Sequence, residues 1–116
     1  MNDIETWFRA RYQSLTKAHR DAFLARLILE FVTINRGYYN DENKERALQF
    51  MKGSSELCRR ISEQLFKYNN NDPSRYPDSV FVAVVLNHMR VVMTENECAT
   101  ILMRILDEAE SNWITN

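Results

Sequence analysis

Glycine, proline and cysteine are scarce in this chain of 116 residues, which contains only two of each. Tight β-hairpins and phosphate-holding loops both require glycine, so its scarcity argues against an all-β fold. Neither the GxGxxG pattern of dinucleotide-binding sites nor the P-loop pattern GxxxxGK[ST] is present. The two cysteines lie in apolar helical patterns without CxxC or CxxH spacing. We therefore interpret Cys58 and Cys98 as buried apolar side chains.

A strong charge of either sign is also lacking. Fifteen Lys and Arg residues against 16 Asp and Glu residues give a net charge of −1. A dedicated nucleic-acid binder depends on a much larger positive field. No apolar run is long enough to span a bilayer, and no charged-then-apolar leader opens the sequence, so we expect a cytoplasmic protein without a membrane partner. With 45% hydrophobic and 27% charged residues, the chain is expected to form one domain over residues 1–116.

Motifs for metal or catalytic chemistry are absent as well. The two histidines, His19 and His88, belong to no HExxH motif, no Glu-x-x-His pair and no Cys/His cluster. We expect no metal and no cofactor, and we interpret His88 as a core or edge histidine. A nucleophilic pair of Cys58 or Cys98 with His88 is compatible with the spacing but has no local signature. We expect no enzymatic activity, and an enzyme whose site no motif reveals is kept as a second alternative.

Helical periodicity dominates the rest of the sequence. Apolar residues at three- and four-residue spacing predict helices over residues 3–13 and 17–36. Gly37 is expected to end the second helix in the left-handed conformation. A capping box over residues 94–97 predicts the start of the last helix. The segment VFVAVVL, residues 80–86, is rich in β-branched residues, but no other segment offers a partner strand, so we predict an apolar central fourth helix.

The longest predicted helix runs from a cap at Asn40 or Asp41 to about Tyr68. Gly53 interrupts it at a cost of about 1 kcal/mol relative to alanine, and this predicts the close approach of another helix or a kink. Phe50 and Leu57 are expected to widen its apolar seam on one side. Steps of four and three residues, typical of a coiled-coil seam, connect Ala47, Met51, Ser54, Cys58, Ile61, Leu65 and Tyr68. The patterns together predict an all-α, single-domain bundle of about five helices with a long third helix.

The stretch NNNDPSRYPDS, residues 69–79, contains both prolines. Asp72 followed by Pro73 is typical of a helix start, and Pro77 ends the resulting short turn. We predict a corner between two helices, with the next helix opening near Asp78. Arg75 and Tyr76 have no structural role in this interpretation.

Large aromatic side chains are numerous for five helical stripes, and exposed aromatics commonly anchor protein interfaces. The wide seam of the third helix points to a second copy or another protein, since symmetric homodimers are the commonest assemblies. Our functional hypothesis is a non-enzymatic protein–protein interaction module, such as a small adaptor, regulator or inhibitor, acting through helix faces. The predicted partner or dimer interface comprises Trp7, Phe50, Ser54, Leu57, Cys58 and Trp113.

The mildly basic first third of the chain supports a different hypothesis. Residues 1–36 hold six Lys and Arg against four Asp and Glu, whereas residues 94–116 hold five acidic residues against Arg104. A nucleic-acid-binding regulator is therefore the alternative, with contacts from Arg9, Arg11, Lys17, Arg20 and Arg26. We favour two solvated surfaces that complement each other, because the positive excess is small beside what phosphate binding recruits.

Overall fold

The computed structural model describes residues 3–66 and 78–115, and most of these residues are helical. The helices are α1 (Ile4–Ser14), α2 (Lys17–Tyr38), α3 (Lys44–Phe66), α4 (Asp78–Met89) and α5 (Glu95–Thr115). No strand occurs within the described ranges. The predicted all-α fold is confirmed, including the helical assignment of the β-branched segment, which lies in α4. None of the described helices is both long and apolar enough to cross a membrane.

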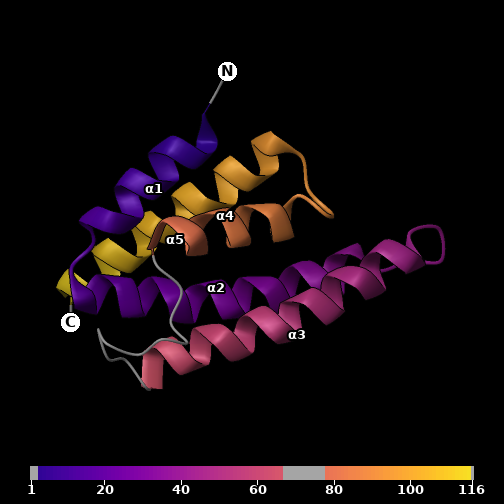
Figure 1. Ribbon diagram of the computed structural model, residues 1–116, viewed down its shortest axis with the longest axis horizontal. Helices are drawn as coiled ribbons and strands as arrows, with labels where there is room; N and C mark the ends of the chain where they lie inside the picture. Colours follow the sequence, from indigo (N-terminus) through magenta and orange to yellow (C-terminus); the bar gives the residue numbers. More distant parts are fainter. Residues whose placement is uncertain (1–2, 67–77, 116) are drawn as a thin grey trace.

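The helices pack around one apolar core. Helix α2 packs against α3 and α5, α1 packs against α4 and α5, and α4 packs against α3. Figure 1 shows α2 and α3 as a long antiparallel hairpin, with α1, α4 and α5 gathered on one side of it. Helix α4 is the most apolar of the five, and Phe81, Val82, Val85, Leu86 and Met89 are fully buried.

Two of the predicted helix starts are confirmed by their hydrogen bonds. The hydroxyl of Thr16 accepts from the backbone N–H of His19 at 3.1 Å, which caps α2. Thr94 and Glu97 form a reciprocal capping box at the start of α5. The hydroxyl of Thr94 accepts from the N–H of Glu97 at 3.2 Å, and the Glu97 carboxylate accepts from the N–H of Thr94 at 2.8 Å. The fourth helix opens at Asp78, also as predicted.

The predicted left-handed ending at Gly37 is wrong. Helix α2 continues through this residue to Tyr38, and no described glycine has a positive φ. Asparagine side chains make the turn instead. The side-chain amide of Asn43 donates to the Tyr38 carbonyl at 2.7 Å, and the side-chain oxygen of Asn40 accepts from the N–H groups of residues 42 and 43 at 2.9 and 3.0 Å. These bonds satisfy terminal backbone groups without glycine, because asparagine can hydrogen-bond its own neighbourhood.

Helix α3 begins later than predicted, at Lys44, and its buried face has a different phase. It spans 23 residues and is one residue longer than α2. Its buried residues follow steps of three and four and are Ala47, Phe50, Ser54, Leu57 and Ile61. Met51, by contrast, is 44% exposed and Cys58 is half-buried. Phe50 and Leu57 are therefore core residues rather than the edge of an exposed seam, with exposed fractions of 0% and 4%.

Some predictions fall outside the described part of the chain. They concern the corner over residues 69–77, with Asp72, Arg75, Tyr76 and Pro77, and the end of the seam at Tyr68. Helix α3 includes Leu65, but the side chain of Leu65 is likewise outside the described part. The interpretation of this stretch as a corner stays a prediction.

Candidate functional site

An apolar groove lies between α2 and α3, with a volume of about 410 Å³. Its side chains are mainly apolar or small, and Arg36 is its one charged lining residue. The lining consists of Ile28, Phe31, Val32, Asn35 and Arg36 from α2, and of Met51, Ser54, Ser55 and Cys58 from α3. We call this feature the α2–α3 groove.

Large hydrophobic side chains are exposed mainly on the same helical hairpin. Within the described residues, five of the seven belong to α2, to α3 or to the C-cap of α2, and the other two are Val80 and Met103. Isolated exposed apolar residues are ordinary, but grouped ones mark interaction sites. Val32 and Met51 are grouped in this sense, because they line the groove from opposite helices. The five residues on the hairpin are Leu29, Val32, Tyr39, Leu48 and Met51.

Beneath the groove, His88 of α4 packs against α2 and α3. Its ring stacks on Phe50, with centroids 4.3 Å apart and an angle of 7° between the planes, and meets Phe31 edge-on at 5.1 Å. Its Nε2 atom lies 2.8 Å from the hydroxyl of Ser54. Burial lowers the pKa of His88 to about 4, so the imidazole is neutral near pH 7. The interpretation of His88 as a packed histidine with a satisfied ring nitrogen is confirmed.

The two cysteines do not have the environment of an activated nucleophile. Burial raises the pKa of the Cys58 thiol, and it raises the pKa of Cys98 to about 11. Both thiols are therefore protonated near neutral pH, whereas nucleophilic cysteines are thiolates. The hydrogen bond and ring contacts of His88 are with Ser54, Phe50 and Phe31, so they do not support the pair of His88 with Cys58 or Cys98 that the spacing left open.

The five basic residues proposed for nucleic-acid contact are all engaged within the protein. Four of them form ion pairs, which join Arg9 to Glu5, Arg11 to Asp107 at 3.1 Å and Glu110 at 2.7 Å, Lys17 to Asp21 at 2.9 Å, and Arg26 to Glu108 at 3.9 Å. Arg20 donates to the Tyr12 carbonyl at 3.2 Å and lies over the Tyr12 ring. The pairs of Arg11 and Arg26 join the basic first third to acidic α5, which is the complementarity expected from the charge pattern. Phosphate groups would have to compete with these carboxylates.

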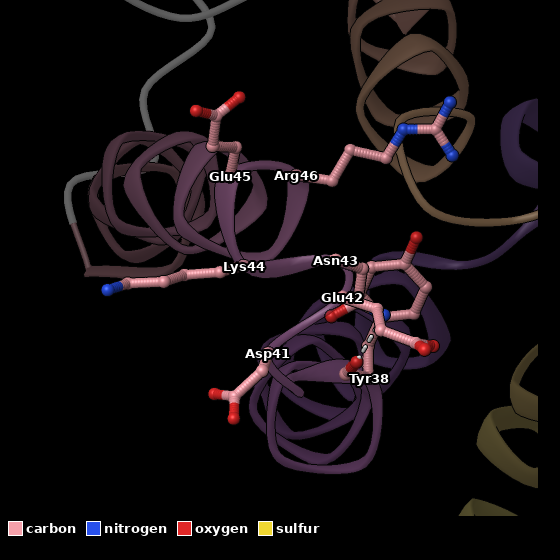
Figure 2. Close-up of a pocket in the computed structure, with 7 residues that line it drawn as sticks. All are labelled: Tyr38, Asp41, Glu42, Asn43, Lys44, Glu45 and Arg46. Atoms are coloured by element: carbon pink, nitrogen blue, oxygen red, sulfur yellow. Dashed lines mark hydrogen bonds between the residues drawn. The ribbon is translucent and has the colours of Figure 1, made fainter.

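A second hollow, of about 530 Å³, lies at the turn between α2 and α3 and is lined by Tyr38 and residues 41–46. Figure 2 shows that the side chains of Lys44, Glu45 and Arg46 point away from one another. The dashed hydrogen bond from Asn43 to the Tyr38 carbonyl serves the turn itself. Binding sites need polar groups that converge, so we do not assign a site to this hollow.

The six residues predicted for an interface divide among different environments. Ser54 and Cys58 reach the α2–α3 groove, whereas Phe50 and Leu57 are buried in the core. Trp7 is half-buried and packs against the core. Trp113 belongs to α5, but its side chain lies outside the described part of the chain.

Sequence reasoning missed Val32 as a groove residue and underrated Met51. Val32 lies one position beyond the buried stripe of α2, and an apolar residue just outside a helical stripe was the available signal. Among the described side chains, no group of three or more His, Cys, Asp and Glu residues could hold a metal ion. Comparisons with protein-family models, with curated proteins and with solved structures found no match for this chain.

Proposed function

We propose that this protein is a non-enzymatic protein–protein interaction module that binds its partner in the α2–α3 groove. The observation that carries the proposal is the exposure of Val32 and Met51, at 46% and 44%, on opposite sides of one apolar groove. Burying such half-exposed side chains against a partner contributes about 1 kcal/mol each. The mainly apolar lining of the groove is not stabilised by contact with water, so a partner that covers it is favoured.

The shape of the groove suits a third helix. Two antiparallel helices leave a furrow into which side chains of another helix pack at three- and four-residue spacing. Ser54 and Ser55 line the groove on the α3 side, and their small side chains allow a partner helix to approach closely. The role of a small adaptor, regulator or inhibitor fits this mode of binding. A cytoplasmic location is part of the proposal and is supported by the free thiols of Cys58 and Cys98.

The test compares two glutamate substitutions of exposed methionines. Met51 lines the groove and is 44% exposed, whereas Met103 of α5 is 48% exposed and is not a lining residue. Immobilised wild-type protein and the variants Met51→Glu and Met103→Glu are incubated with native lysate, and bound proteins are identified by mass spectrometry. We expect a bound protein that the wild type and Met103→Glu retain and Met51→Glu loses.

Circular dichroism and thermal melting establish that both variants fold like the wild type. Partners that bind all three proteins equally well would refute docking in the groove. If a second groove variant, Val32→Glu, also bound these partners like the wild type, tolerance of the glutamate at residue 51 alone could not explain the result.

A further inference from the structure

We propose that the occupant of the α2–α3 groove is an amphipathic helix of another protein, with acidic residues beside its apolar stripe. This inference rests on the proposed docking function. Its basis is the distribution of unpaired positive charge over the described side chains. Four basic residues there have no ion pair, and they are Arg36, Lys44, Arg46 and Lys52.

Every other described Lys or Arg residue is engaged by neighbouring groups of the protein. Arg59 and Arg60 bind Glu56, Arg90 binds Glu95 and Arg104 binds Glu30, in addition to the pairs of α1 and α2. The unpaired cations are thus confined to the end of α2 and the first half of α3. This is the part of the molecule that carries the groove and most of the exposed apolar side chains.

Two of the four cations lie at the groove. Arg36 is a lining residue, and Lys52 directly follows the lining residue Met51 on its exposed side. Lys44 lies about 10 Å before Met51 along the helix axis and lines the hollow at the turn, together with Asp41, Glu42 and Glu45. Arg46 also lines this hollow and is not a lining residue of the groove, and Figure 2 shows its side chain pointing away from that of Lys44. It serves as a matched control.

The carboxylates of the hairpin do not neutralise this border. Glu56 and Glu63 are both held by Arg59, at 2.5 and 2.9 Å. The carboxylates without an ion pair among the described hairpin residues are at the turn, beyond the lining residues of both helices, and are Asp41, Glu42 and Glu45. An apolar furrow bordered by free cations matches a helix with acidic flanks, since complementary charge selects partners and raises association rates.

A second copy of this chain fits the groove less well. In a two-fold symmetric pairing the same patch meets itself, so the border of Arg36 and Lys52 would face an equally basic border. Like charges brought together at an interface oppose association. A heterologous acidic helix meets no such repulsion.

The probe is a synthetic amphipathic peptide of about 18 residues, which is about 27 Å long as a helix. It carries leucines at three- and four-residue spacing and glutamates beside them, and a second peptide has lysine at each glutamate position. Fluorescence anisotropy measures the affinity of each peptide for the wild type, for the double variant Arg36→Glu/Lys52→Glu and for the control Arg46→Glu. Circular dichroism verifies that all three proteins are equally helical.

We expect the wild type and Arg46→Glu to bind the acidic peptide roughly ten-fold or more tightly than the basic peptide at low salt. The double variant should reverse that preference. Equal binding of the two peptides to the wild type, or no effect of the double charge reversal, would overturn the proposal.

Two further measurements distinguish the failure of this inference from the failure of the docking function. A concentration-dependent dimer of the wild type in sedimentation equilibrium, dissociated by Met51→Glu, would overturn the acidic-helix proposal and leave the groove as a docking surface for a second copy. If Met51→Glu no longer binds the lysate partners but the wild type binds both peptides equally, the acidic-helix proposal alone is overturned. Lysate partners that bind Met51→Glu as well as they bind the wild type would refute the docking function itself.

Discussion

The imidazole ring of His88 fills the space that a side chain at Gly53 would need. A Cβ atom at residue 53 would lie 2.7 Å from Cε1 and 2.8 Å from Nδ1 of the ring. The ring cannot easily move aside, because it stacks on Phe50 and its Nε2 atom is hydrogen-bonded to Ser54. This contact gives a physical reason for a glycine in the middle of α3, where it costs about 1 kcal/mol relative to alanine.

Gly53→Ala should therefore destabilise the protein, although alanine is the better helix former. We expect a loss of about 1–3 kcal/mol in the free energy of unfolding, because the added methyl group overpacks the contact with His88. The control is Gly37→Ala inside α2, where no atom lies within 4 Å of the added Cβ. That change should stabilise the protein by up to about 1 kcal/mol. Urea unfolding measures both, and a gain in stability for both variants would contradict the close packing.

The stability of the fold should fall in mild acid because of His88. Burial lowers its pKa to about 4 from the ordinary 6.5 of the unfolded chain. Between these pH values the unfolded chain binds a proton at His88 and the folded protein does not. The free energy of unfolding is therefore unaffected by His88 above about pH 6.5 and falls as the pH is lowered towards 4. The loss is at most about 3 kcal/mol at 1.36 kcal/mol per pKa unit, and solvent screening of the partly exposed ring reduces it. The described contacts of the ring, with Phe31, Phe50 and Ser54, bring no charge that could stabilise the imidazolium.

Denaturant unfolding at several pH values between 7 and 5, for the wild type and for His88→Gln, measures this effect. The variant should have a much flatter dependence. The two carboxylates with lowered pKa values, Glu56 and Glu95, do not interfere in this range. Hydrogen bonds from Arg59 and Arg90 lower the pKa values of Glu56 and Glu95, so their contributions are lost only as the pH falls below the ordinary value of 4.5. An equally steep dependence in His88→Gln would assign the effect to other groups.

The phase of α3 can be tested with adjacent residues. Phe50 is fully buried and Met51 is 44% exposed. Phe50→Ala should lower the free energy of unfolding by about 3–5 kcal/mol, whereas Met51→Ala should change it by less than about 1 kcal/mol. Thermal or urea unfolding separates the two cases. Similar small losses for both variants would restore the seam in which Phe50 lies at the edge.

Arg11 should stabilise the contact between α1 and α5 more than a local ion pair stabilises its own helix. Its guanidinium lies 2.7 Å from Glu110 and 3.1 Å from Asp107. Arg11→Ala is expected to cost about 1 kcal/mol at low salt, since one arginine binds two carboxylates, and Lys17→Ala, which removes the exposed pair with Asp21, about 0.3–0.5 kcal/mol. The difference should shrink in 1 M salt because screening weakens exposed pairs. Equal losses that do not respond to salt would indicate that packing, not charge, dominates.

Helix starts and helical character were predictable because their causes are local. Thr16 and the Thr94–Glu97 box act over three residues, and periodic apolar residues identify helices whatever those helices pack against. The ending at Gly37 was predicted wrongly for a related reason. Glycine permits the left-handed conformation but does not require it, and the hydrogen bonds of Asn40 and Asn43 place the turn two residues later.

The candidate site depended on contacts that no local pattern contains. In α3, Ala47, Ser54 and Ile61 belong to either of two stripes, and the spacing cannot tell whether Phe50 and Leu57 or Met51 and Cys58 point inward. Packing against α2 and α4 turns Phe50 and Leu57 inward, so that Met51 lines the groove opposite Val32.

The same distinction holds for glycine and for charge. The sequence by itself showed that Gly53 allows a close approach, and it showed the opposite charges of the two ends of the chain. The tertiary structure decided that the approaching group is His88, and that Arg11 meets Glu110, 99 residues away. A sequence determines by itself what depends on neighbours within a helical turn. Contacts between residues far apart in the chain are decided only when the whole core packs, because the native set of contacts has the lowest total energy.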